Sequence, residues 1–264
     1  MSASSTPHRT KKRFGQHFLI DDGVVDAMVR AIAPGRDDRL VEIGPGLGVL
    51  TQPLLERVDT MRVIEIDRDL AATLKSRLPV SGKRIEIINE DVLRYDFPDP
   101  GQRVVGNLPY NISTPLLFHL FACADRVVDM HFMLQKEVVD RLVATPGSKT
   151  YGRLSVMAQY HAKMWPLFDV PPAAFDPPPK VDSSVIRLVP RALPPTAQAL
   201  AGALERVVRA AFAQRRKTLR NNLAGIIEPH RIEAAGIDPG SRAETLSGEA
   251  FLRLAEVYQS NNRQ

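Results

Sequence analysis

The chain has 264 residues, of which 44% are hydrophobic, and it carries a formal net charge of +5 with an isoelectric point near 9.5. This length suits one large domain or a domain with a smaller appendage. The single cysteine excludes an internal disulfide and a cysteine-rich metal site, and no apolar run reaches the roughly 20 residues of a membrane span. The basic charge indicates an anionic partner, although a solvated basic surface without a partner would have the same composition.

The N-terminal residues 1–12 are polar and basic and lack the apolar stretch of a secretory signal. We therefore expect a disordered arm on a cytoplasmic protein. Residues 11–20 mix cations with aromatic residues, which is typical of a segment that contacts phosphates and folds over a ligand. A basic tail that packs two phenylalanines into the core is the simpler alternative. Next, Asp21 or Asp22 can cap a helix that ends before Pro34.

An apolar strand is predicted at 39–43, and it ends in a loop that contains Gly44, Gly46 and Gly48. Glycines after a first strand let the backbone approach a ligand closely. The spacing lacks the last glycine of a dinucleotide fingerprint and the Gly-Lys-Ser/Thr of a P-loop. The pattern therefore favours a ligand without a pyrophosphate group.

Two carboxylates follow the next strands. The strand at 61–66 contains Glu65, roughly 20 residues after the glycines, where an acidic residue typically binds ribose hydroxyls. The strand at 85–88 leads to Asp91, which could accept a hydrogen bond from an adenine amine. Either acid alone could be a helix cap. In series with the glycine loop, they favour a nucleoside site.

The apolar run that begins at Val104 ends abruptly at Asn107, Pro109 and Tyr110, which indicates a buried parallel strand that leads into a ligand-binding loop. An exocyclic amine on an aromatic base is a poor nucleophile, because its lone pair is delocalised into the ring. The Asn107 carbonyl oxygen and a backbone carbonyl near Leu108 or Pro109 could accept its two N–H groups, while Tyr110 stacks on the base. A strand-ending turn with a core tyrosine is the alternative.

Further elements complete an α/β sheet of about seven strands. They are a helix from Ser113, a strand at 129–135, a helix at 136–144, a polar loop at 145–153, and strands at 163–170 and 181–189. Prolines bracket Phe175, so its ring could be held as a second stacking face opposite Tyr110. Alternatively, Phe175 shields an irregular hairpin from solvent.

After a linker at 192–196, an apolar stripe predicts a helix at 200–212, and Ser247 can cap the last helix. The segment 214–222 contains Arg215, Arg216, Lys217 and Arg220, which suit an RNA-docking face. Cations that complement the C-terminal dipole of a helix are the alternative.

The order of these motifs resembles that of S-adenosylmethionine-dependent methyltransferases, and most closely the KsgA-like small-subunit (16S) ribosomal RNA adenine N6,N6-dimethyltransferases. The resemblance is strong over about residues 13–190 and looser beyond. It rests on the motifs at 13–16, 41–48, 63–68, 106–115, 133–138 and 175–183. It implies a Rossmann-like methyltransferase domain at 13–191 and a small all-α domain at 197–264.

The resemblance also implies the functional residues. The cofactor, S-adenosylmethionine, would contact His17, Leu19, Gly44, Glu65, Asp91 and Asn107. The target base would lie among Asn107, Pro109, Tyr110 and Phe175. His17 departs from the family, which usually has asparagine there; it could be a catalytic base or, as we expect, a hydrogen-bond partner of the cofactor.

By this resemblance the chain dimethylates N6 of two adjacent adenosines in the 3′-terminal hairpin of 16S rRNA, within the small (30S) ribosomal subunit. We expect a monomer that needs neither a metal nor a membrane. Large-subunit rRNA methyltransferases of the macrolide-resistance type share the fold, and a non-catalytic ribosome-assembly factor could have kept it. A protein or DNA amine methyltransferase would more often carry Asn-Pro-Pro-Tyr, which Leu108 disfavours.

Overall fold

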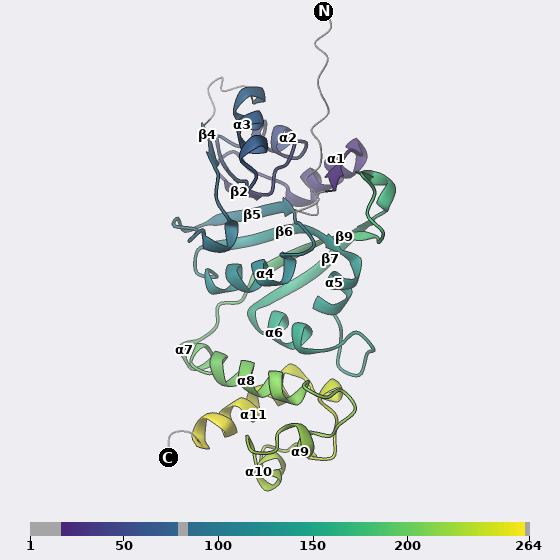
Figure 1. Ribbon diagram of the computed structural model, residues 1–264. Helices are drawn as coiled ribbons and strands as arrows, with labels where there is room; N and C mark the ends of the chain where they lie inside the picture. Colours follow the sequence, from purple (N-terminus) through teal and green to yellow (C-terminus); the bar gives the residue numbers. More distant parts are fainter. Residues whose placement is uncertain (1–16, 79–83, 262–264) are drawn as a thin grey trace, which may run out of the picture. The chain divides into compact units, whose positions relative to one another are not determined.

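The computed structural model of the chain describes residues 17–78 and 84–261 (Figure 1). The arm predicted at 1–12 and the motif at 13–16 lie outside these residues. The described chain forms two compact units. Of the described residues, the first unit contains those up to Lys136 and also Leu167–Ile186, and the second contains Glu137–Pro166 and those from Arg187 onward.

The expected seven-stranded sheet is present, in the order β4-β3-β2-β5-β6-β9-β7. Its strands are β2 (Arg39–Ile43), β3 (Thr60–Ile64), β4 (Arg84–Ile88), β5 (Gln102–Asn107), β6 (Val127–Gln135), β7 (Ala162–Val170) and β9 (Ser183–Pro190). The neighbours from β4 to β6 pair in parallel. Because the chain runs outward from β2 to β4 and then returns to β5 on the other side of β2, the strand order reverses between β2 and β5. Open α/β sheets bind their ligands outside the strand ends at such a point.

Helices cover the sheet because its strands are apolar on both faces. In α1 (Asp22–Ile32) and α2 (Thr51–Leu55), the buried residues join a core cluster with alternate residues of the strands, such as Leu40 and Val63. The residues of opposite parity, such as Val41 and Val104, are buried as well. The Asp21 side chain accepts a hydrogen bond from the backbone N–H of Val24 and caps α1, as predicted. The remaining helices of this unit are α3 (Arg68–Arg77) and α4 (Ser113–Ala122).

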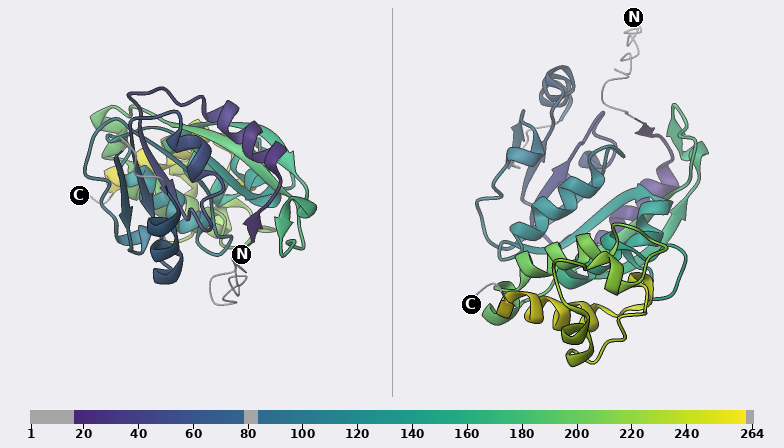
Figure 2. Two further views of the ribbon diagram at one scale, coloured as in Figure 1. Left: turned by 90° about the horizontal axis from the view of Figure 1, so that it is seen from above. Right: turned by 60° about the horizontal axis from the view of Figure 1, so that its bottom comes forward.

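A two-stranded antiparallel ribbon joins the beginning of the described chain to its middle. It pairs β1 (Phe18–Leu19) with β8 (Phe175–Asp176), with Leu19 opposite Phe175. Both views of Figure 2 show the purple strand β1 beside the green segment that contains β8. The sequence did not predict this ribbon, since two residues are too few to show a strand period.

The second unit contains the C-terminal helices. Its helices are α5 (Lys136–Leu142), α6 (Arg153–His161), α7 (Pro195–Gln198), α8 (Ala201–Ala211), α9 (Leu219–Asn222), α10 (Pro229–Ala234) and α11 (Gly248–Asn261). Helix α8 packs against α11, where the rings of Phe212 and Phe251 stack at 5.6 Å. The hydroxyl of Ser247 accepts a hydrogen bond from the backbone of Ala250, the predicted cap of the last helix. None of the helices in the described ranges is long and apolar enough to span a membrane.

The second unit begins earlier in the chain than the linker predicted at 192–196. It includes residues 137–166 because α6 packs against α8 and α11. The sequence did not predict α6. Six of its nine residues are buried, five of them in an unbroken run from Leu154 to Ala158, so the segment lacks the apolar stripe that marks a helix buried on one side only.

Gly106 provides a test of the sheet at the point where the strand order reverses. A Cβ atom at this position would overlap the carbonyl oxygen of Ile43 on the neighbouring strand β2. Gly106→Ala should therefore lower the free energy of unfolding by about 1–3 kcal/mol, as measured by urea titration. Gly202→Ala is the matched control, because nothing lies near an added Cβ there and the residue is helical. That variant should gain up to about 1 kcal/mol; equal effects of the two substitutions would contradict this account of the strand contact.

Candidate active site

A cavity of about 310 Å³ opens at the carboxyl ends of β2, β3 and β5. Eight of the nine site residues predicted from the sequence line it; these are His17, Leu19, Gly44, Glu65, Asp91, Asn107, Pro109 and Tyr110. All of them belong to the first unit. The structure thus brings together residues that are up to 93 positions apart, counted from His17 to Tyr110. The ninth residue, Phe175, does not line the cavity.

The glycine loop forms one wall of the cavity. Gly44 and Gly46 have φ angles of +66° and +56°, which side-chain-bearing residues rarely adopt. A Cβ on Gly46 would lie 3.2 Å from the ring of Phe18, so this ring packs directly on the glycine backbone. The loop therefore leaves its backbone open to a ligand on one side while an aromatic ring covers it on another.

Glu65 is held where β3 ends. Its carboxylate is 4% exposed and accepts hydrogen bonds from the backbone N–H of Asp67 at 2.9 Å and of Gly46 at 3.3 Å. The side-chain amide of Asn89 donates to the Glu65 carbonyl oxygen at 2.8 Å and fixes the turn. Burial raises the pKa of Glu65. The two backbone donors orient the carboxylate between the glycine loop and the end of β3, where it can accept hydrogen bonds from hydroxyl groups.

Asp91 both caps a short helical turn and lines the cavity. One carboxylate oxygen accepts a hydrogen bond from the backbone N–H of Leu93 at 3.0 Å and caps a short 3-10 turn, Val92–Arg94. The same residue lines the cavity. The two interpretations of this acid, cap and ligand contact, are therefore compatible, because a carboxylate has a second oxygen that can face a ligand.

Glu42 is a cavity residue that the sequence analysis did not single out. It lies in β2, is only 2% exposed, and its Oε2 has no hydrogen-bond partner among the residues the structure describes. Burial, together with the nearby carboxylate of Glu65, raises the pKa of Glu42 to about 8. The signal was present in the sequence, since an acidic residue interrupts the apolar strand 39–43.

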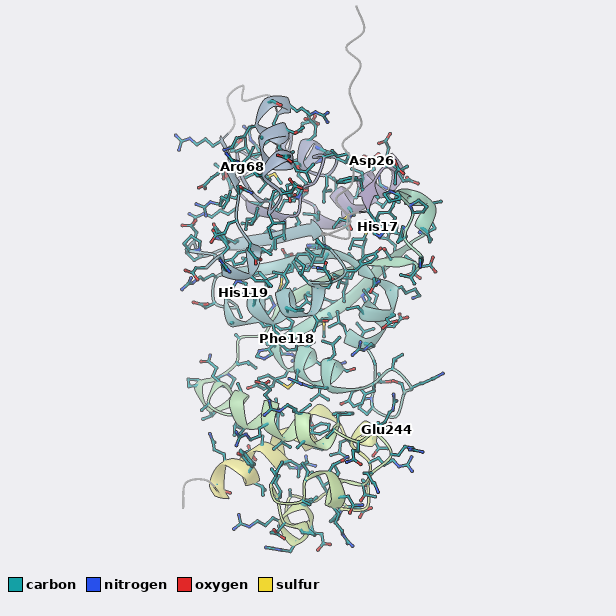
Figure 3. All side chains as sticks on the ribbon, in the orientation of Figure 1. His17, Asp26, Arg68, Phe118, His119 and Glu244 are labelled. Carbon is teal, nitrogen blue, oxygen red and sulfur yellow. The ribbon has the colours of Figure 1, made fainter. Side chains whose placement is uncertain are left out.

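The amide of Asn107 is oriented by the backbone of β1. Its Nδ2 donates to the carbonyl oxygen of His17 at 3.3 Å. Since the nitrogen is engaged there, the side-chain oxygen is the atom left to accept a hydrogen bond from a ligand. The His17 ring is itself held, because its Nδ1 lies 2.7 Å from the carbonyl oxygen of Pro177 and must donate to it. Figure 3 labels His17 among the side chains of this unit.

The backbone carbonyl oxygens of Leu108 and Pro109, which follow Asn107, differ in their hydrogen bonding. The carbonyl oxygen of Pro109 accepts hydrogen bonds from the backbone of Ile112 at 3.2 Å and from the hydroxyl of Ser113 at 3.1 Å. The carbonyl oxygen of Leu108 accepts no hydrogen bond from the described residues. Of the two carbonyls considered from the sequence, the one at Leu108 is therefore better placed to accept a hydrogen bond from a ligand.

Tyr110 presents an aromatic ring to the cavity. Its hydroxyl lies 2.8 Å from that of Ser183, and its ring centroid is 5.7 Å from the ring of His17, tilted by 30°. Burial raises the pKa of the phenol, so the ring stays neutral at physiological pH. A neutral ring whose hydroxyl is anchored is a suitable surface for stacking a base.

Phe175 lies in the core. Its side chain is 2% exposed and belongs to the same cluster as Leu19. The cause is the ribbon of β1 and β8, in which Phe175 pairs with Leu19 while Phe18 pairs with Asp176. Phe18 and Leu19 both line the cavity, and the ring of Phe18 packs on the backbone of Gly46. Phe18 thus lines the cavity together with Tyr110, whereas Phe175 does not.

Comparison with known proteins gives consistent matches. The family model described as ribosomal RNA adenine dimethylase matches residues 7–260. A protein of Bordetella petrii named ribosomal RNA small subunit methyltransferase A is 57% identical over 252 residues, which are 95% of this chain and 95% of that protein. A protein of Cronobacter sakazakii with the same name is 52% identical over 260 residues, 96% of this chain and 95% of that protein.

Solved structures match as well. The crystal structure of a dimethyladenosine transferase from Plasmodium falciparum has a TM-score of 0.79 at 25% identity, covering 93% of this chain and 98% of that one. That of the 23S rRNA methyltransferase ErmE has a TM-score of 0.71 at 28% identity, covering 92% and 99%. The fold is therefore shared with rRNA methyltransferases.

Glu42 gives the site a measurable pH dependence. The pKa of Glu42 in the folded chain is above its ordinary value of about 4.3, because the folded chain favours the protonated acid. Protonated Glu42 therefore contributes fully to the free energy of unfolding below about pH 4.3, and this contribution is lost as the pH rises toward about 8. Glu42→Gln should remove this loss. Without cofactor, the free energy of unfolding of the parent should fall relative to the variant, by up to about 1.4 kcal/mol per pH unit between pH 5 and 8.

Urea titrations at four pH values would measure this difference. The exposed Glu56, in Glu56→Gln, is the matched control and should follow the parent at every pH. Parallel curves for the parent and Glu42→Gln would show that Glu42 is not a buried neutral acid.

Proposed function

The chain belongs to the ribosomal RNA adenine dimethylase family, and we propose that it dimethylates N6 of two adjacent adenosines in the 3′-terminal hairpin of 16S rRNA. The chain is a methyltransferase that uses S-adenosylmethionine, because its family and its structural neighbours are S-adenosylmethionine-dependent methyltransferases. The observation that carries the proposal is that Glu65 and Asn107 line one cavity. A nucleoside-binding acid and an amine-binding amide therefore open onto the same space.

The cavity fits the cofactor chemically. The backbone of Gly44 and Gly46 is open to a close approach, and the buried carboxyl of Glu65 can receive ribose hydroxyls. Asp91 can accept from the adenine amine. The unpartnered Oε2 of Glu42 adds a second buried acid, which suits a ligand with cationic groups. When bound there, S-adenosylmethionine supplies a methyl group that its sulfonium makes electrophilic.

The protein's own task is to aim the lone pair of the target amine. The side-chain oxygen of Asn107 and the carbonyl oxygen of Leu108 are two acceptors on consecutive residues. By taking both N–H groups of the amine, they would turn its lone pair away from the acceptors and toward the cavity. Tyr110 would stack on the base, a contact worth about 1–3 kcal/mol that offsets part of the cost of extruding an adenine. Orientation is thus the main catalytic contribution.

The second methyl transfer places a different demand on the same residues. After the first transfer the amine keeps one N–H and carries one methyl group. Only one of the two acceptors can then be used, and the other must tolerate the added bulk. We propose that Asn107 keeps its hydrogen bond in both steps, because its amide is fixed by His17 whereas the Leu108 carbonyl belongs to a loop.

RNA binding is assigned to the cations at 214–222. In the second unit, Arg215 is engaged with the Glu244 carboxylate at 2.8 Å and the Lys149 carbonyl oxygen at 2.6 Å; Glu244 is labelled in Figure 3. Arg216 and Lys217 are exposed, and their side chains form no ion pair within the described part of the chain. We therefore assign phosphate contacts to Arg216 and Lys217, and to Arg215 the structural task of holding the loop at 145–152.

We further propose that the substrate is the 16S rRNA within the small (30S) ribosomal subunit, and that the enzyme acts in the cytoplasm as a monomer. The names of the relatives from Bordetella petrii and Cronobacter sakazakii support the small subunit over the large-subunit alternative. The presence of Glu65, Asp91 and Asn107 in one cavity supports an active enzyme over a non-catalytic assembly factor.

Asn107 tests the proposed reaction. Asn107→Ala removes the oriented acceptor and should lower methyl incorporation into 30S particles at least about 100-fold. Its affinity for S-adenosylmethionine, measured by calorimetry, should change by no more than about tenfold, the value of one hydrogen bond. Tyr110→Phe is a comparison that keeps the ring and should retain most activity. Turnover near the parental rate in Asn107→Ala would refute the role.

Arg216 and Lys217 test the RNA interaction. Replacing both with alanine should weaken binding to 30S particles and lower the slope of log affinity against log salt by about 1 for each phosphate that no longer pairs with a cation. The control replaces Arg30 and Lys75, two exposed cations of the first unit, and removes the same charge. Equally weakened binding in both double variants would mean that net charge alone, and not this segment, determines affinity.

A further inference from the structure

A second cavity lies at the amino-terminal ends of the strands, whereas the candidate active site lies at their carboxyl ends. It has a volume of about 450 Å³, and the first residues of four neighbouring strands line it. These residues are Arg39 of β2, Thr60 of β3, Arg84 of β4 and Gln102 of β5. Since each of these strands rises about 3.3 Å per residue, the cavity is roughly 15 Å from the carboxyl ends that form the first site. It is a separate space within the first unit.

The register of the strands places its side chains on one face. Arg39 pairs with Gln102, Val41 with Arg62, and Arg62 with Glu86. Paired residues of a sheet point to the same side, and so do residues two apart along a strand. Three arginines, one amide and one carboxylate therefore converge on a patch that contains the apolar side chain of Val41.

The patch contains more cationic than anionic side chains. Arg62 binds both nearby acids, through Nε to the Glu86 carboxylate at 2.6 Å and through Nη1 to Asp99. Arg39 donates one N–H to the carbonyl oxygen of Pro100 at 3.2 Å and is otherwise exposed. Arg84 is exposed, and its side chain forms no ion pair with another of the described residues. The single charge of Arg62 offsets one of the two carboxylate charges, and the guanidinium groups of Arg39 and Arg84 at the rim leave the patch with a net charge of +1.

Gln102 is the unexplained group. It is 1% exposed, yet neither its Nε2 nor its Oε1 has a hydrogen-bond partner within the described part of the chain. Buried polar groups are nearly always paired, because leaving one unpaired destabilises the folded state. A planar amide that presents a donor and an acceptor side by side matches the edge of a nucleobase.

We propose that this second cavity binds one nucleotide, whose base edge pairs with the Gln102 amide and whose phosphate lies between Arg39 and Arg84. Arginine suits the phosphate because its planar donors match two phosphate oxygens at once. The nucleotide is either a residue of an RNA strand or a free adenine nucleotide, since both present the same groups. Nucleotide binding at the second cavity does not require methyl transfer, because the proposed reaction takes place at the carboxyl ends of the strands.

Calorimetry on the full chain tests the site with two probes, adenosine 5′-monophosphate and a ten-nucleotide single-stranded RNA. Saturating S-adenosylhomocysteine fills the cofactor position of the first cavity, and any binding at the target-base position beside Tyr110 is recognised because Gln102→Leu and Arg84→Ala leave it unchanged. The parent should bind at least one probe, and Gln102→Leu and Arg84→Ala should each weaken that binding at least about fivefold. Arg30→Ala removes the same charge from helix α1, none of whose residues lines this cavity, and should bind like the parent. If the variants weaken only RNA binding, the site holds an RNA residue; if they weaken mononucleotide binding, it holds a free nucleotide.

Two outcomes would overturn the proposal. One is the absence of binding of either probe to the saturated parent. The other is parental affinity in Gln102→Leu, which would mean that water satisfies the buried amide. Gln102→Leu should melt at or above the parental temperature, because it replaces an unpaired buried amide with an apolar group. Arg84→Ala changes only an exposed side chain, so it keeps the test valid should Gln102→Leu fail to fold.

Discussion

The hydrogen bond from the Asn107 amide to the His17 carbonyl oxygen is the interaction on which the arrangement of the site depends. A primary amide can turn over and exchange its donor for its acceptor at little cost unless one end is fixed. The β1 backbone fixes the nitrogen end, and the His17 ring ties that backbone to Pro177. Three segments that are distant in sequence thus determine which atom of the Asn107 amide is left free to face the cavity.

The electrostatics of the cavity follow from burial. Glu42 and Glu65 are both nearly inaccessible, and each has a raised pKa. Burial disfavours the ionised form of each acid, and the charge of Glu65 further disfavours ionisation of Glu42. A cationic ligand relieves that repulsion, so the empty cavity is less favourable to the folded chain than the filled one. Phe18, packed on Gly46, adds an apolar boundary that keeps the local dielectric constant low.

The sequence predicts those elements of the fold that have a local signal, and it misses those that depend on contacts between distant residues. The strand at 39–43 and the helix after Asp21 were predicted correctly because their apolar periods are strong and their ends carry glycine or a capping acid. Helix α6 escaped prediction because five consecutive residues, Leu154 to Ala158, are buried, so its buried residues do not form a stripe along one side. The ribbon of β1 and β8 is a long-range pairing of two residues each, and no local pattern encodes it. The burial of Glu42 and the position of Phe175 in the core likewise depend on residues that are distant in sequence.

The hydrogen bond between His17 and Pro177 joins residues that are 160 positions apart. During translation, which adds about 5–20 residues per second, roughly 10–30 seconds must pass between the synthesis of the two partners. The parallel strands β2 to β5 can pair in that interval, but the wall supplied by β1 cannot close until β8 has left the ribosome. The nascent chain can therefore form this part of its sheet well before the wall of the cavity that β1 supplies is in place.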